Sequence, residues 1–440
     1  MSNSQPIIVL QSHRVVVGGS IQPAAIVIQG ERILEVSSYG HPDAVDVGQS
    51  LILPGMVDSH VHLNEPGRTE WEGMATGTAA AAAGGITTLC DMPLNSSPVT
   101  TTVAALVEKR SAATGKLSID IGFHGGVVPG NQPHIVELLD AGVLGIKAFL
   151  CHSGIDDFPN VGERELREVM PLLAERGVPL LAHAEIAESA VTMSDPRRYL
   201  DYLNTRPTSF EREAIELLID LCKQTGCPVH IVHLADAGSV PMLRSARASG
   251  LPITVETCPH YLVFAADEIP DGATMYKCAP PIRDRENREA LWDAIREGVI
   301  DMIASDHSPC PPSMKSLDTG RFDQAWGGIS SLQLGLPVIW AEASKRGFAI
   351  TDVVRWMSRE PAKLLGLSRK IAPGERADLI IFDDDSPWVV DGQALLHRHK
   401  VTPYDGRLVR GIVQQTFLRG SVAMPGRGII IDKRESVRHG

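Results

Sequence analysis

Apolar runs alternate with amphipathic stretches through the middle of this 440-residue chain. Helical periodicity is clearest over Glu163–Arg176, Phe210–Thr225 and Arg285–Glu297. Between such stretches lie eight short apolar runs that are typical of buried strands, at Leu53–Leu63, Ile86–Met92, Leu117–His124, Val143–Leu150, Val178–His183, Pro228–Leu234, Leu251–Thr257 and Val299–Asp306. Eight strand–helix units in about 310 residues predict an α/β fold with a (β/α)8 TIM-like barrel. A doubly wound sheet would use the same units.

The two ends of the chain have a different texture, with short strand-like runs punctuated by turn residues. These runs are Ile7–Leu10, Arg14–Val17 and Ala24–Ile28 near the N-terminus, and Ala377–Phe382, Val409–Val413 and Gln415–Gly420 near the C-terminus. We therefore expect a small β-sandwich domain built from both termini, residues 1–52 plus 364–440, beside a barrel domain over residues 53–363.

Polar side chains follow nearly every apolar run of the middle region. His60 and His62 end the first run, and alternate residues of a strand project from the same face. Alone, this pair fits half of a metal site as well as it fits one core and one solvated histidine. Further runs carry or end in Lys147, His183, His233 and Asp306. Because barrel strands end at one mouth, these side chains should converge, and imidazole and carboxylate suit zinc, iron, manganese or cobalt.

Lys147 does not fit a metal site as an ammonium group, which has three donors and no lone pair. One interpretation is an ordinary lysine that is ion-paired or extends to solvent. The other is a lysine that has lost its proton and added carbon dioxide, so that the carbamate oxygens bridge two metals. The spacing of residues does not separate these alternatives.

Charge and cysteine content exclude several classes of partner. The net charge of −12 leaves no basic patch for nucleic-acid phosphates. Seven cysteines without a CxxC pair indicate a reducing, cytoplasmic compartment rather than a disulfide framework. The N-terminus lacks the pattern of a secretory signal, and no apolar stretch predicts a membrane span. These features argue against a nucleic-acid partner and against a membrane-spanning protein.

The residues at the strand ends resemble those of the cyclic-amidase branch of the amidohydrolase superfamily, which contains dihydroorotases, hydantoinases (dihydropyrimidinases) and allantoinases. The resemblance spans the whole chain. It implies two divalent metal ions, most commonly zinc, with iron, cobalt or manganese as alternatives. One ion would be held by His60, His62, Lys147 as N6-carboxylysine, and Asp306; the other by Lys147, His183 and His233. His233 is favoured over His230 because it lies at the strand's end.

Local motifs resemble the allantoinases within that branch. They lie at Asn64–Gly73, Asp91–Ser96, Lys147–Gly154, Glu256–Leu262, Ser305–Cys310 and Trp326–Gln333. Dihydroorotases place an Arg at the position of Asn64 to bind the substrate carboxylate, and Asn cannot replace that charge. Hydantoinases place a Tyr at the position of His152. The resemblance thus implies hydrolysis of the neutral hydantoin ring of allantoin to allantoate, in purine and ureide nitrogen catabolism.

The resemblance also assigns roles to individual residues. Asp306 would act as the catalytic acid and base, or serve as a ligand only. Candidate substrate contacts are Asn64, Asn95, His152, Ser153, Cys258, Gly328 and Ser330, although turn or capping chemistry explains several of them equally well. A homo-oligomer, dimer or tetramer, is implied. The alternatives are a hydantoinase, dihydropyrimidinase or dihydroorotase, or a non-catalytic scaffold of the same fold.

Overall fold

Eight parallel strands form the centre of the computed structural model, which describes residues 6–187 and 192–432. Each lies within one of the eight predicted runs. They are β6 (Met56–Val61), β7 (Ile86–Asp91), β8 (Asp120–Phe123), β10 (Ile146–Phe149), β11 (Leu180–His183), β12 (Val229–Ile231), β13 (Ile253–Thr257) and β14 (Met302–Ile303). A further short strand, β9 (Gly125–Gly126), continues β8 and pairs with β10. The predicted (β/α)8 barrel is confirmed.

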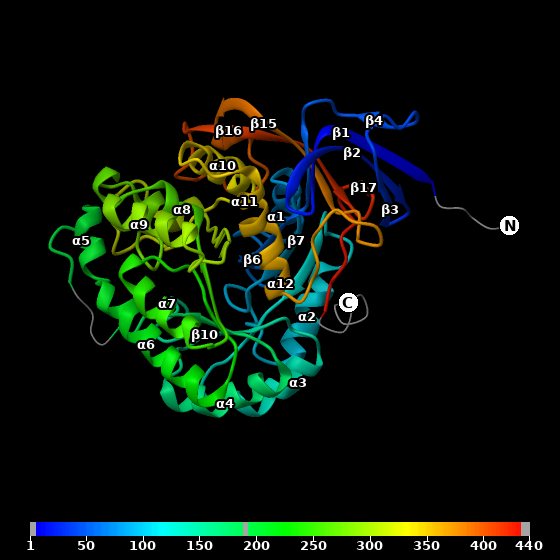
Figure 1. The fold of residues 1–440 in the computed structure, drawn as a ribbon. Coiled ribbons are helices and arrows are strands. Elements are labelled where there is room, and N and C mark those ends of the chain that lie inside the picture. Colours follow the sequence, from blue (N-terminus) through cyan, green and yellow to red (C-terminus); the bar gives the residue numbers. More distant parts are fainter. Residues whose placement is uncertain (1–5, 188–191, 433–440) are drawn as a thin grey trace.

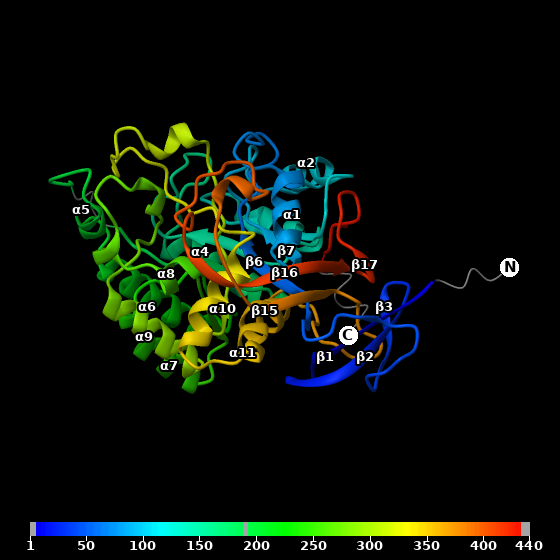
Figure 2. The same cartoon turned by 90° about the horizontal axis from the view of Figure 1, so that it is seen from above.

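Helices surround the strands, as Figures 1 and 2 show. In the described part of the chain the α-helices are α1 (Met74–Ala83), α2 (Val103–Ala113), α3 (Ile135–Asp140), α4 (Glu163–Arg176), α5 (Tyr199–Asn204), α6 (Thr208–Thr225), α7 (Val240–Ala248), α8 (Pro259–Val263), α9 (Arg285–Arg296), α10 (Gly335–Lys345), α11 (Ile350–Val354) and α12 (Glu360–Leu364). The three predicted helices correspond to α4, α6 and α9. Gly177 and Gly226 end α4 and α6 in the left-handed conformation, which glycine adopts without a Cβ clash.

The barrel closes between its first and last strands. Val61 forms a parallel bridge with His307, and the His62 amide donates to the His307 carbonyl at 2.9 Å. On the opposite side, the Leu144 amide donates to the Phe123 carbonyl at 2.9 Å, next to the β9–β10 pairing. The carboxyl ends of all eight strands therefore surround one mouth.

Strands from both termini pair in one eight-stranded sheet, in the order β17-β16-β15-β5-β1-β2-β3 with β4 beside β1. In Figure 1 its blue N-terminal and orange-red C-terminal strands lie together at one side of the barrel. The strands are β1 (Ile7–Val17), β2 (Ser20–Gln29), β3 (Arg32–Ser37), β4 (Val45–Asp46), β5 (Leu51–Pro54), β15 (Leu379–Val389), β16 (Leu408–Leu418) and β17 (Ser421–Val422). The junction is β5 with β15, where Leu53 is opposite Ile380.

The first N-terminal strand differs from the expectation. The runs predicted at Ile7–Leu10 and Arg14–Val17 form a single strand, β1, with a register shift between Ser12 and Val15. The Ser12 hydroxyl donates to the Ser50 carbonyl at 2.6 Å and accepts from the Arg14 amide at 2.9 Å. The bulge held by these bonds interrupts the apolar alternation without ending the strand.

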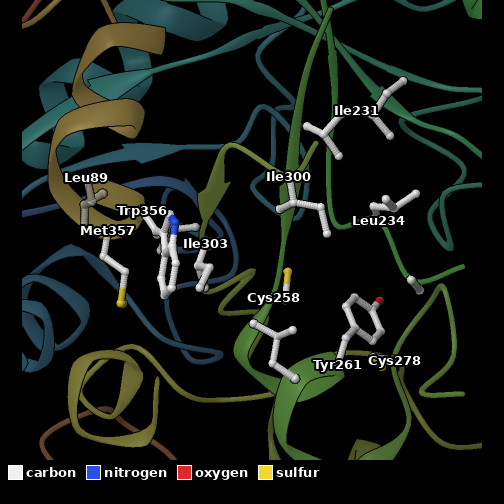
Figure 3. Close-up of a cluster of buried hydrophobic side chains, with 14 of the residues drawn as sticks. Leu89, Ile231, Leu234, Cys258, Tyr261, Cys278, Ile300, Ile303, Trp356 and Met357 are labelled. Atoms are coloured by element: carbon white, nitrogen blue, oxygen red, sulfur yellow. The ribbon is translucent and has the colours of Figure 1, made fainter. Parts of the chain in front are cut away.

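An apolar core packs between the barrel strands and the helices that surround them. Figure 3 shows part of it, with Trp356 and Met357 beside Ile303 and with Cys258 near Tyr261. Trp356 is 1% exposed and lies in the segment Arg355–Arg359, which joins α11 to α12. Because this region is apolar and closely packed, it offers few groups for chemistry, and the polar strand ends are left as the place for a site. None of the helices in the described part of the chain has the length and apolar character needed to span a bilayer.

A buried ionic network joins the terminal sheet to the barrel. Asp120, at the start of β8, is fully buried and bonds the guanidinium groups of Arg376 and Arg419. Asp378 pairs with Arg369 at 3.2 Å and with Arg376 at 3.0 Å. These five charges come from the barrel and from the C-terminal part of the chain, so the network fixes one to the other.

We expect Asp120→Asn to lower the free energy of unfolding by about 3 kcal/mol or more, because it removes the buried carboxylate that bonds both Arg376 and Arg419. The measurement is chemical denaturation followed by circular dichroism. The matched control is Asp385→Asn, which removes an exposed carboxylate that pairs with Arg410 at 2.6 Å and should change stability little. Equal stability of the two variants would show that the network does not hold the domains together.

Candidate metal centre

All six predicted ligands line the same cavity at the mouth of the barrel, which has a volume of about 870 Å³. Each is buried, and they come from five different strand ends, at His60, His62, Lys147, His183, His233 and Asp306. The fold thus brings together side chains that are up to 246 positions apart, which is the separation of residues 60 and 306. Convergence of this kind is typical of the catalytic face of a barrel.

One group of donors lies at the junction of the first and last strands. The Nε2 atoms of His60 and His62 are 3.3 and 3.5 Å from Oδ1 of Asp306. The donor atoms of the three residues lie within 4.8 Å of one another, close enough to bind one ion. Burial raises the pKa of the Asp306 carboxyl, but the neighbouring His60 and His62 more than reverse this and lower it well below its usual value.

The second group comes from β10, β11 and the end of β12. The ring centres of His183 and His233 are 4.6 Å apart, and the ring of His60 is 5.4 Å from that of His233. The Lys147 side chain ends among them, with its nitrogen 5.0 Å from the ring centre of Phe149. Burial lowers the pKa of Lys147 to about 8, so a fraction of this amine is neutral near physiological pH.

Carboxylates behind the imidazoles fix their orientation. Glu256, on β13, contacts Nδ1 of His60 at 2.5 Å and Nε2 of His230 at 3.0 Å. His230 also contacts the Thr254 hydroxyl through Nδ1, so both of its nitrogens are engaged, whereas His233 lines the cavity. This arrangement leaves Nε2 of His60 directed toward Asp306, as a carboxylate–histidine–metal arrangement requires.

His183 is held in a similar way. Its Nε2 lies 2.7 Å from Glu185, whose carboxylate also bonds the guanidinium of Arg206. Burial opposes ionisation of Glu185, but Arg206 and His183 outweigh it and lower the pKa of the carboxyl to about 2. With Nε2 engaged, Nδ1 of His183 is the nitrogen left for a metal.

The backbone is strained at the same positions. His233 and Asp306 have φ angles of 41° and 44°, and Asn64 and Asn95 have φ angles of 64° and 66°. Non-glycine residues in this region cost of order 1–3 kcal/mol each and persist where surrounding structure imposes them. Four such residues near one mouth indicate that the positions of their side chains are maintained although the backbone conformation is unfavourable.

The donor set fits two divalent ions. It supplies imidazole nitrogens and a carboxylate, which suit zinc and its neighbours. Buried nitrogen atoms of Lys147 and His233 have no hydrogen-bond partner among the described residues, and such atoms are costly unless a ligand satisfies them. Two further sets of close donors border the site, Cys151 with His183 and Glu185, and Cys258 with His260 and Asp306.

The predicted substrate contacts fall into two groups. The cavity is lined by Asn95, His152, Ser153 and Gly328. By contrast, Asn64, Cys258 and Ser330 are buried and are not among its lining residues. The Asn64 amide donates to the Pro309 carbonyl at 3.4 Å, and the Ser330 carbonyl accepts from Thr402 at 2.7 Å. Both residues therefore bond other protein groups beside the cavity.

Neighbouring protein groups already engage some of the lining residues. The Ser153 hydroxyl donates to the Phe158 carbonyl at 2.6 Å. The Gly328 amide donates to the Lys277 carbonyl at 2.8 Å, and the Gly328 carbonyl accepts from the Lys315 ammonium. Asn95 differs, because its Nδ2 is 3.4 Å from Nδ1 of His62 while its buried Oδ1 has no partner among the described residues. Asn95 can therefore both hold a ligand histidine and bond a substrate.

Sequence patterns assigned no role to Glu256, Glu185 or Arg206, the residues that hold the ligand histidines. Glu256 is the one carboxylate in a strand predicted to be buried, a position that requires a partner. Glu185 follows His183 by two residues, which places it on the same side of the strand end. Arg206 carries no such signal, since it reaches the site through tertiary folding alone.

Comparison with known proteins agrees with this geometry. The profile of the amidohydrolase family matches residues 51–423. The chain is 44% identical to an allantoinase of Saccharomyces cerevisiae and 46% identical to one of Streptomyces avermitilis, in each case over 95% of both chains. Among solved structures, L-hydantoinase (dihydropyrimidinase) from Arthrobacter aurescens matches with a TM-score of 0.89 and 29% identity, over 98% of this chain and 100% of that one. The chain therefore belongs to the amidohydrolase family.

Proposed function

We propose that this protein is a metal-dependent allantoinase, which hydrolyses the hydantoin ring of allantoin to allantoate in purine nitrogen catabolism. The observation that carries the proposal is a complete set of six buried donors around one cavity, in a chain 44–46% identical to allantoinases. A scaffold without activity has no use for this costly buried arrangement. The choice of substrate follows from the relatives and from the neutral character of the pocket.

Amidohydrolases generally use a binuclear metal centre, and the donors here divide naturally in two. His60, His62 and Asp306 would hold one ion, and His183 and His233 the other. Lys147, as a carbamate formed with carbon dioxide, would bridge them, which accounts for a buried amine without a hydrogen-bond partner. Zinc is the ion we favour. Bound there, two divalent ions would make a nucleophilic water available at neutral pH and polarise the scissile carbonyl.

Asp306 has the geometry to move the proton. Its Oδ1 faces His60 and His62, and it accepts a hydrogen bond from the Ser308 hydroxyl at 3.0 Å. In hydrolysis, water oxygen adds to the ring carbonyl carbon and Asp306 takes the water's proton. The ring C–N bond then breaks, and Asp306 delivers the proton to the departing nitrogen. The carbonyl carbon becomes the carboxylate of the product.

The described residues that line the pocket include no free guanidinium, the group that best binds a carboxylate substrate. Among the described residues that line the cavity, Arg206 is the one guanidinium, and Glu185 already neutralises it. The lining Lys277 donates to the carbonyls of Phe322 and Ala325. Asn64 stands where dihydroorotases have an arginine. A neutral ring such as allantoin needs no guanidinium partner, whereas the carboxylate of dihydroorotate would be buried without one.

We also propose a cytoplasmic homo-oligomer, a dimer or tetramer. All seven cysteines are free and buried, as a reducing compartment favours.

Substrate preference provides the first test. With the metal-loaded protein, we expect kcat/KM for allantoin to exceed that for hydantoin, dihydrouracil and dihydroorotate, with dihydroorotate the poorest because of its charge. Ring opening is followed by ultraviolet absorbance or product chromatography. Faster turnover of hydantoin or dihydrouracil would instead assign the protein to the hydantoinases.

Replacement of Lys147 tests the bridging carbamate. We expect protein prepared in ¹³C-bicarbonate to show one carbamate resonance by NMR, and Lys147→Met to lose this resonance, bind fewer than two metal ions and lose activity. Lys345→Met, at an exposed lysine, is the matched control and should retain all three properties. A resonance that persists in Lys147→Met would mean that the carbamate lies elsewhere.

Replacement of Asp306 tests proton transfer. Asp306→Asn should lower kcat by about 10²–10⁴-fold because an amide cannot shuttle a proton. Metal content should be measured in parallel by atomic emission, since a loss of metal alone would also reduce activity. Asp156→Asn, at an exposed carboxylate after β10, serves as the control. An Asp306→Asn variant with full metal content and unchanged kcat would rule out the proposed role.

A further inference from the structure

The first observation concerns His307, which follows Asp306 and closes the barrel. Its carbonyl accepts from the His62 amide, so the backbone of this residue joins the strand ends that carry His62 and Asp306. Its ring is fully buried, and Nδ1 accepts from the amides of Ser331 and Leu332 at 3.1 and 3.3 Å. Because Nδ1 is the acceptor, the proton of the neutral ring lies on Nε2.

Glu72 lies beside that nitrogen, at an ion-pair distance but without hydrogen-bond geometry. Its Oε2 lies 3.5 Å from Nε2 of His307, and both side chains are completely buried. The same carboxylate accepts from the backbone amide of Arg398 at 3.0 and 3.2 Å. A buried carboxylate persists only where such donors compensate its desolvation. Glu72 is thus held between the barrel and residue 398.

Residue 398 belongs to the terminal sheet and not to the barrel, since the loop of residues 390–407 connects β15 to β16. The loop bonds the segment after β6 at two more points, from Arg398 Nε to the Glu72 carbonyl at 2.6 Å and between His399 Nε2 and the Glu70 carbonyl at 2.7 Å. His397 of the same loop is also fully buried, with its ring centre 5.7 Å from that of His307.

Two further bonds connect the loop to the segment after β14. The Leu396 amide donates to the Gln333 side chain at 2.8 Å, and the Thr402 hydroxyl donates to the Ser330 carbonyl at 2.7 Å. The loop therefore contacts both of the segments that follow the first and last barrel strands. These are the strands whose ends carry His60, His62 and Asp306.

We propose that Glu72 is a positioning residue through which the 390–407 loop of the terminal domain sets the geometry of Asp306 and His62, by holding the His307 ring. This inference rests on the proposed function, in which those two side chains hold a metal ion. Glu72 touches neither the ion nor the substrate. Its contribution passes through His307, whose displacement would move the junction of the first and last strands.

The test uses the full-length protein loaded with cobalt(II), whose visible absorption reports the geometry of its ligands. We expect Glu72→Leu to shift this spectrum and to lower kcat for allantoin by about 10- to 100-fold with little change in KM, as for other groups that orient metal ligands. Glu72→Gln keeps an acceptor for His307 and should restore most of the activity. Metal content should stay at the parent level in both variants.

Glu70→Leu is the matched control, because it removes an exposed carboxylate from the same segment and should leave spectrum and kcat unchanged. A folded Glu72→Leu protein with the parent spectrum and kcat would overturn the proposal, as would a Glu72→Gln protein as impaired as Glu72→Leu.

Arg398→Pro, which removes the loop amide that donates to the Glu72 carboxylate, decides the question if Glu72→Leu does not fold. A shifted cobalt spectrum would support the coupling and an unchanged one would overturn it. The spectrum needs no substrate, so failure of the parent protein to hydrolyse allantoin would refute the proposed function and leave this test intact.

Discussion

Closure of the barrel between its first and last strands is the constraint on which the site depends. The bond from the His62 amide to the His307 carbonyl joins the ends of β6 and β14, and this contact places His60 and His62 against Asp306. Without closure, the pair of histidines and the carboxylate would belong to separate strand ends. The topology of the barrel therefore matters for the site, because it brings donors that are distant in sequence close enough to bind one ion.

A second consequence of closure is burial, which makes polar groups costly and forces them into networks. Glu256 bonds His60 and His230, and Glu185 bonds His183 and Arg206, so that protein groups orient the rings of His60 and His183. Lys147 stands outside these networks, as a buried amine without a hydrogen-bond partner among the described residues. A buried amine without a partner is costly, which supports the carbamate proposed at this position.

Sequence patterns predicted the fold closely, because buried parallel strands are continuous apolar runs and each of the eight runs contains one barrel strand. The donors at strand ends could be predicted for the same reason. Patterns could not predict which polar residues face the cavity. Asn64 and Ser330 are predicted substrate contacts that do not line the cavity; the Asn64 side chain donates to the Pro309 carbonyl, and the Ser330 carbonyl accepts from Thr402. Arg206 was missed because its position depends on tertiary packing and not on a strand register.

The placement of Glu72 and Arg398 gives a physical reason for two terminal segments to pair into one sheet beside the barrel. The β5–β15 pairing joins the C-terminal part of the chain to the strand that precedes β6, and the β15–β16 loop extends from there to Glu72. Both ends of this loop are held by paired strands of the sheet. The loop therefore has less conformational entropy than a flexible segment of equal length and is more rigid. Rigidity at this point matters because the left-handed φ of Asp306 must be imposed by its surroundings.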